Sequence, residues 1–303
     1  MKLGAKITYA VALVPAVLYL LLNGLSWIVN RITPSVLGGY FGYDIFYRLS
    51  SGPISNVHYI GMVLVIVLAA LTAEVCFSKS KSSFAPVIPT GLLLVKNLVD
   101  SLFIIAGFVI TLLNLFRVIP HDAFMGFNGN FISRLLTIAP LEDGIAALLQ
   151  SLIFLFDAAS QIAVFGMIAA AIVSWIALLM AKRAFAKKMA TVSMIASAVI
   201  AVLFVILKLV TVITYICTLI ILFEGDCPLP LFIVVAIVLC IDALIIGMLV
   251  LYMLCQSIIA NLQLRLRISE EQHTEDLETS LPDELSAEPE AEPSAELSQA
   301  EEQ

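Results

Sequence analysis

The sequence has few charged residues, few histidines and few cysteines for its length. Of its 303 residues, 13% are charged, three are histidine and five are cysteine, whereas 61% are hydrophobic. A water-soluble domain of this size could not bury so much apolar surface. The composition therefore excludes a soluble globular protein and indicates a membrane protein.

Motifs that carry catalysis or cofactor binding are also missing. There is no H-E-x-x-H metal motif, no G-x-S-x-G nucleophile elbow, no phosphate-binding P-loop and no C-x-x-C pair. His58, His121 and His273 are scattered along the chain, which argues against a metal site. An intramembrane aspartyl protease would need two facing carboxylates, but neither Asp100 nor Asp242 follows a Gly-x-Gly sequence. We therefore expect no enzyme activity, no cofactor, no metal and no nucleic-acid partner.

Long apolar runs are what the sequence has instead. A helix needs about 20 mostly apolar residues to cross the hydrocarbon core of a bilayer, and the sequence holds six candidate runs separated by more polar segments. It therefore predicts an all-α bundle of about six transmembrane helices within residues 1–268. The expected spans are residues 7–29, 59–77, 90–116, 162–181, 190–223 and 229–255.

One apolar run is too long for a single ordinary crossing. Residues 145–181 would form a straight helix of about 55 Å, against about 30 Å for the hydrocarbon core. We expect a separate re-entrant or interfacial helix over 145–156, which would place Asp157 near the outer surface. The following span has small residues at steps of three and four, a pattern that allows close helix packing. This stripe consists of Ala163, Gly166, Ala170, Ser174 and Ala177.

Basic residues are concentrated on one predicted side of the membrane. With a cytoplasmic N-terminus, the inner segments hold ten lysines and arginines and the outer segments hold four. The positive-inside rule then predicts a multi-pass protein of the cell membrane with both termini in the cytoplasm. The ten inner residues are Lys2, Lys6, Lys79, Lys81, Lys182, Arg183, Lys187, Lys188, Arg265 and Arg267.

The end of the chain differs in composition from the rest. Residues 269–303 carry 13 acidic residues, no lysine or arginine and no aromatic residue. Such a segment cannot bury a core and is predicted to be a disordered cytoplasmic tail. It is either a solvating tail or a docking segment for a basic partner, which could be a cytoplasmic protein or the chain's own loop 182–188.

Ionisable residues inside the predicted spans are the candidate functional residues, because each costs about 2.5 to 3.5 kcal/mol to insert at the bilayer centre. Lys208 and Asp242 lie in neighbouring antiparallel spans at nearly the same depth and are expected to pair. Lys96 and Asp100 are four residues apart, so they share one helix face and can neutralise each other. Glu74, on the preceding span, is a rival partner for Lys96.

These charges favour a transport function. They comprise three acids and two bases, so one carboxylate lacks a basic partner and is expected to be protonated or to bind a cation. We therefore expect translocation of a small solute or cation, coupled to protons or to another cation. The alternative is a non-catalytic membrane subunit or scaffold whose acidic tail docks a cytoplasmic partner, and an intramembrane enzyme ranks third.

Overall fold

The protein is built from long helices. The computed structural model describes residues 2–41, 55–77, 84–115, 144–222 and 229–279, and all regular structure within these ranges is α-helical. The predicted all-α fold class is therefore confirmed. The helices are α1 (Lys2–Phe41), α3 (Ser55–Phe77), α4 (Val87–Leu115), α6 (Gly144–Leu179), α7 (Ala186–Leu222) and α8 (Leu229–Thr279).

The outer surface of the bundle suits lipid. Val192, Val202 and Val205 of α7 are 65%, 62% and 63% exposed. Apolar side chains exposed in this way are unfavourable in water but are favourable against the lipid tails of a bilayer. The chain is a polytopic membrane helix bundle, with α4 as a further predicted span. Five stretches of the described residues are long and apolar enough to cross a membrane: Leu3–Ile28, Tyr59–Phe77, Leu155–Leu179, Ala186–Cys217 and Leu239–Gln272.

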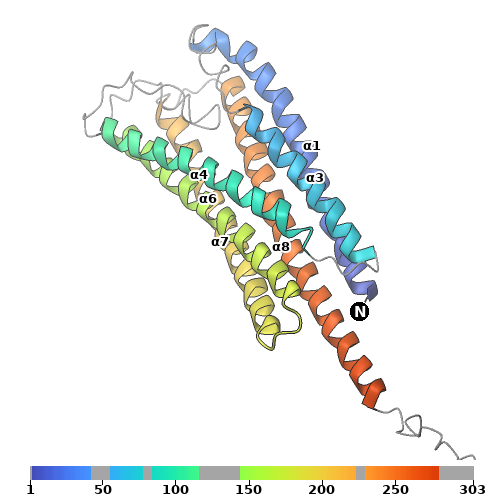
Figure 1. Cartoon of the computed structure of the whole chain (residues 1–303). Helices are drawn as coiled ribbons and strands as arrows, with labels where there is room; N and C mark the ends of the chain where they lie inside the picture. The colour runs from blue at the N-terminus through green and yellow to red at the C-terminus, as the bar shows by residue number, and fades with distance from the viewer. Residues whose placement is uncertain (1, 42–54, 78–83, 116–143, 223–228, 280–303) are drawn as a thin grey trace, which may run out of the picture.

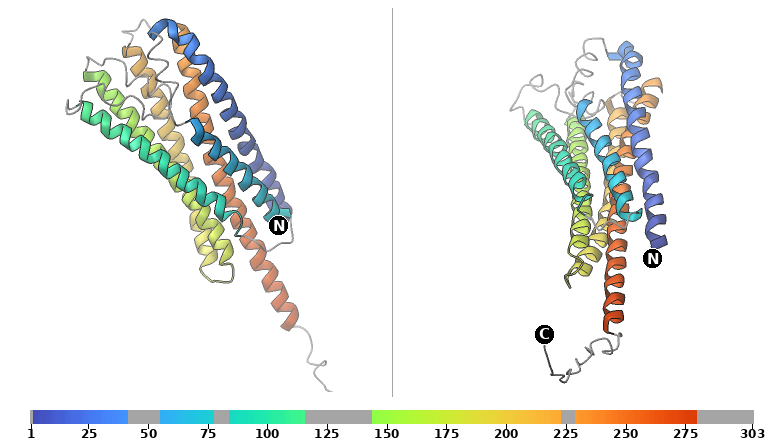
Figure 2. Two further views of the ribbon diagram at one scale, coloured as in Figure 1. Left: turned by 45° about the horizontal axis from the view of Figure 1, so that its top comes forward. Right: turned by 45° about the vertical axis from the view of Figure 1, so that its right-hand side comes forward.

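The helices form a ring of neighbours in which α6 and α8 also contact each other across the middle. Each helix packs against the next in the order α1, α3, α4, α6, α7, α8, and α8 returns to pack against α1. Helices α6 and α8 also touch each other, so each contacts three neighbours. Figures 1 and 2 show the resulting elongated bundle, with α1, α3 and α8 together on one side and α4, α6 and α7 on the other.

One end of the bundle carries most of the described basic side chains. The start of α1, the turn between α6 and α7 and the later part of α8 lie at this end (Figure 1). The end of α8 projects beyond the rest of the bundle. We call this the basic end, defined by exposed Lys6, Lys182, Arg183, Lys187, Lys188 and Arg265.

The predicted small-residue stripe of α6 faces α7. A Cβ added at Gly166 would lie 3.3 Å from Ile200 Cδ1 of α7. The Ser193 hydroxyl of α7 donates to the Ala170 carbonyl of α6 at 2.5 Å, and the Ser174 hydroxyl lies 3.1 Å from that of Ser193. Small side chains thus let the two backbones approach closely enough for direct interhelical hydrogen bonds.

A closely packed apolar core fills the bundle near the basic end. Trp175 and Leu178 of α6 are fully buried with Ala190 of α7 and with Ile259 and Leu264 of α8. Some nearby buried polar groups bond between helices: the hydroxyls of Ser197 and Ser257 lie 3.0 Å apart, and the Thr72 hydroxyl donates to Gln256 Oε1 at 3.0 Å. Contacts between helices, rather than contacts with lipid, stabilise this part of the bundle.

Several expected boundaries differ from those of the structure. The segment 145–156, expected as a separate helix, is instead the first third of the continuous helix α6. The reason is that 145–181 contains no proline and one glycine, so nothing in the run interrupts the backbone hydrogen bonds. Helix α6 begins eleven residues before the apolar stretch Leu155–Leu179 and ends with it.

The second difference concerns the acidic tail, which was expected to be disordered from residue 269. Helix α8 continues to Thr279, so eleven residues of that segment (279 minus 268) are helical. Arg267 interacts electrostatically with Glu270 and Glu271, one turn further along the helix, and such pairs support exposed helices. The first proline after α8 is Pro282. Residues 280–303 lie outside the described part of the chain.

Helix α1 also runs to Phe41, through part of the expected loop that follows residue 29.

Candidate functional site

The α6–α7 hairpin places a carboxylate opposite an ammonium group inside the bundle. Asp157 lies 22 residues before Leu179, where α6 ends, and Lys208 lies 22 residues after Ala186, where α7 begins. Because α6 and α7 are antiparallel neighbours joined by a short turn, two residues that are equally many positions from the turn lie at the same height in the bundle. Lys208 Nζ accordingly lies 2.6 Å from Asp157 Oδ1, with 14% and 15% of the two side chains exposed.

Asp157 is therefore the ion-pair partner of Lys208, in place of the expected Asp242. The sequence prediction missed Asp157 because it assumed a break before residue 157 that would leave this aspartate at the outer surface. With α6 continuous, the residue lies about one turn from the middle of its helix. The equal counts along the hairpin were the signal in the sequence that could have identified the pair.

Asp242 lies beside this pair without forming an ion pair of its own among the described residues. It interacts electrostatically with both members, attracted by Lys208 and repelled by Asp157. Helix α8, which carries Asp242, packs against both α6 and α7. The predicted proximity of Lys208 and Asp242 is therefore present, but the ion pair of the lysine is with Asp157.

The predicted pair within α4 is confirmed. Lys96 Nζ lies 2.5 Å from Asp100 Oδ2, with 17% and 27% of the side chains exposed. Glu74 is not the partner of Lys96, because it is exposed on α3 and the α3 residue beside the lysine stem is Gly61. Gly61 precedes Glu74 by 13 residues, or about 20 Å of helix. The rival pairing failed because the two helices cross at a different height than expected.

Tyr19 of α1 joins the α4 pair at a close crossing of three helices. A Cβ added at Gly61 would lie 2.8 Å from Tyr19 Oη and 3.1 Å from Lys96 Cε. The buried Tyr19 side chain also interacts electrostatically with Asp100. Gly61 thus leaves the space in which the phenol and the lysine stem meet.

We expect Gly61→Ala to lower the free energy of unfolding by about 1 to 2 kcal/mol, because the added methyl group must displace the buried phenol. Thermal unfolding of the purified protein in detergent measures the change. The control is Gly91→Ala in α4, where an added Cβ meets nothing within 4 Å and should stabilise by the helix propensity of alanine. Equal effects at both positions would contradict the close crossing.

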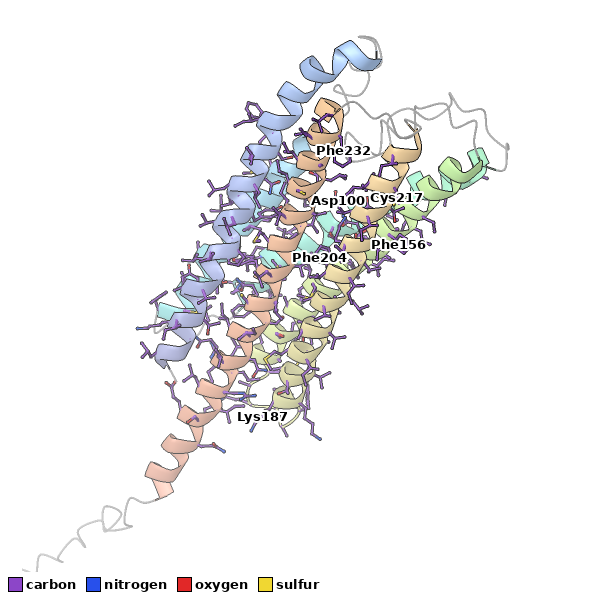
Figure 3. The ribbon with its side chains drawn as sticks, turned by 180° about the vertical axis from the view of Figure 1, so that it is seen from behind. Asp100, Phe156, Lys187, Phe204, Cys217 and Phe232 are labelled. Atoms are coloured by element: carbon purple, nitrogen blue, oxygen red, sulfur yellow. The ribbon has the colours of Figure 1, made fainter. Side chains whose placement is uncertain are left out.

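The two ion pairs lie at a similar height in the bundle. Asn97 Nδ2 of α4 donates to the Gln161 carbonyl of α6 at 3.4 Å. One turn further along α4 is Asp100, and one turn back along antiparallel α6 is Asp157. Figure 3 shows the labelled Asp100 at a height close to that of Phe156. We call this set the charge layer, and it consists of Lys96, Asp100, Asp157, Lys208 and Asp242.

The charge layer holds three acids and two bases, so it carries one formal negative charge when every group is ionised. The acid–base count expected from the sequence is thus present, with Asp157 in the place of Glu74. Within the described residues, no group of three or more histidine, cysteine or acidic side chains is arranged to hold a metal ion. A carboxylate without a base of its own can share a basic partner, take up a proton or bind a cation.

Comparisons with other proteins supply no family for the chain. No protein-family model, no curated protein and no solved structure matches it.

Proposed function

We propose that the protein translocates a small solute or cation across the membrane and uses the charge layer to couple this movement to protons or to another monovalent cation. The observation that carries the proposal is the position of Asp242 beside the Lys208–Asp157 ion pair. A pair that served only to hold two helices together would need no third carboxylate. Ionisable residues within transmembrane helices commonly mark ion and substrate pathways.

The energetic reason is the cost of an uncompensated charge. An ionised carboxylate without a partner is expensive inside a membrane, so Asp242 must share Lys208, take up a proton or bind a cation. The first option strips Asp157 of its partner. A site with one more acid than base therefore favours the binding of one proton or other cation, and a cation-coupled transporter requires this property.

The sidedness that we propose follows from the basic end. Exposed lysines and arginines gather where α1 begins and where α6 turns into α7. The positive-inside rule places such an end in the cytoplasm. The charge layer lies about 33 Å along the helices from the α6–α7 turn, since 22 residues separate each member of the Lys208 pair from that turn.

A second candidate function rests on the projecting end of α8. This helix extends beyond the bundle at the basic end (Figure 1), where it exposes Glu270 and Glu271. A helix that projects from the membrane and continues into an acidic segment can dock a basic cytoplasmic protein. The protein would then be a membrane subunit or scaffold, and the charge layer would be structural.

Asp242→Asn distinguishes the two functions. We expect proteoliposomes of the unaltered protein, loaded with a pH-sensitive dye and held under a valinomycin–potassium voltage clamp, to dissipate an imposed pH or sodium gradient faster than protein-free liposomes. Asp242→Asn should bring the rate down to the protein-free level, because the amide cannot take up the cation. Glu74→Gln removes an exposed carboxylate of α3 outside the layer and should leave the rate unchanged. A rate in the unaltered protein equal to that of Asp242→Asn for both gradients would overturn the proposal.

A further inference from the structure

We propose that Lys208 exchanges between Asp157 and Asp242, so that cation binding at Asp242 determines whether α7 is tied to α6 or to α8. This inference rests on the proposed function and names the moving part of the same site. It starts from the observation that the Lys208 ammonium group interacts with two carboxylates, those of Asp157 on α6 and Asp242 on α8.

The geometry makes both partners accessible to one lysine. Helix α7 packs against α6 and α8, and α6 and α8 touch each other. Lys208 therefore projects from α7 toward a place where all three helices meet. Its flexible four-carbon stem carries a compact charge that can turn between neighbouring acceptors. In the structure the ammonium is on Asp157 at 2.6 Å.

The electrostatics make the two partners alternatives. Asp157 and Asp242 repel each other and both attract Lys208. When Asp242 holds a proton or another cation, Lys208 remains with Asp157 and every charge is paired. When Asp242 loses that cation, its negative charge competes for Lys208 against Asp157. The third helix packed against α8 is α1, and it has tyrosines but no charged residue between Lys6 and Arg31 that could intervene.

The packing around the charge layer allows the choice of ion-pair partner by Lys208 to affect how α7 packs against α8. Gly247 lies five residues beyond Asp242 on α8, and a Cβ there would lie 4.0 Å from Cε1 of Phe204, which lies four residues before Lys208 on α7. The α7–α8 contact beside the layer is thus an aromatic edge against a glycine rather than an interlocked ridge. The α6–α7 contact is the more extensive of the two, although both contacts carry hydroxyl hydrogen bonds nearer the basic end. Transfer of Lys208 to Asp242 would strengthen the less extensive of the two contacts.

The experiment compares the stability of asparagine variants in detergent. If Lys208 exchanges, Asp157→Asn and Asp242→Asn each leave it one carboxylate, and each should lower the Tm by about 3 °C or less. The double variant leaves Lys208 without a partner and should lower the Tm by about 10 °C, well beyond the sum. A double variant too unstable to purify, from single variants that purify normally, counts as the same result.

The control uses the other ion pair of the charge layer. Asp100→Asn breaks the pair within α4, and its combination with Asp242→Asn should give additive losses, because Lys208 keeps Asp157 in that variant. Additive losses in the Asp157 and Asp242 double variant would overturn the exchange, whatever the liposomes show.

The proteoliposome assay separates the inference from the proposed function. With exchange, Asp157→Asn should abolish flux as completely as Asp242→Asn does, because Lys208 then occupies Asp242 permanently. Non-additive stability without any flux in the unaltered protein would retain the exchange and overturn the transport function. Full flux in a folded Asp157→Asn variant would overturn the exchange and retain the transport function.

Discussion

Replacement of Lys208 by leucine should lower the free energy of unfolding by about 3 kcal/mol, because it leaves both Asp157 and Asp242 without a base. Protonation of the stranded carboxylates limits the loss but cannot remove it, since each must then be neutral to remain inside the bundle. Unfolding of the purified variant, followed by intrinsic fluorescence against temperature or denaturant, measures the change.

The double variant Lys208→Leu with Asp157→Leu identifies the partner. Removing both members of a buried pair leaves a smaller penalty than removing one, so the double variant should be more stable than Lys208→Leu alone. Lys187→Leu at the exposed basic end is the matched control and should change stability by less than about 0.5 kcal/mol. If Lys208→Leu behaved like Lys187→Leu, the ion pair would contribute nothing to the fold.

Trp175→Ala should have the largest effect of any single truncation proposed here, a loss of about 3 to 5 kcal/mol. Trp175 is fully buried in the core near the basic end, where α6, α7 and α8 meet. Deleting the indole leaves a cavity among buried side chains of these helices. Thermal unfolding in detergent tests the expectation.

Val173→Ala provides the comparison on the same helix. Its side chain is 36% exposed on the outer face of α6, and the loss should stay below about 1 kcal/mol because no enclosed cavity forms. Similar losses at the two positions would show that the core near the basic end is not closely packed. The contrast therefore tests whether protein contacts or lipid contacts stabilise this end.

Features set by local periodicity and composition could be predicted from the sequence. The all-α membrane bundle follows from the apolar runs, because only helices satisfy every backbone group inside one segment in lipid. The Lys96–Asp100 pair follows from a spacing of four residues, which on any helix places two side chains on one face. Close packing on the stripe of α6 likewise depends on the small size of Gly166, Ala170 and Ser174 and needs no knowledge of the partner helix.

Only the tertiary structure decided which charges meet between helices. The sequence predicts an acidic partner for Lys208 at the correct height, but two aspartates satisfy that condition. The expected break before residue 157 placed Asp157 at the outer surface and so left Asp242 as the predicted partner. Glu74 was excluded by the height at which Gly61 of α3 crosses Lys96. The physical reason is that helical periodicity fixes direction and rise within one helix, whereas tilt and axial shift between helices depend on side-chain packing over their whole length.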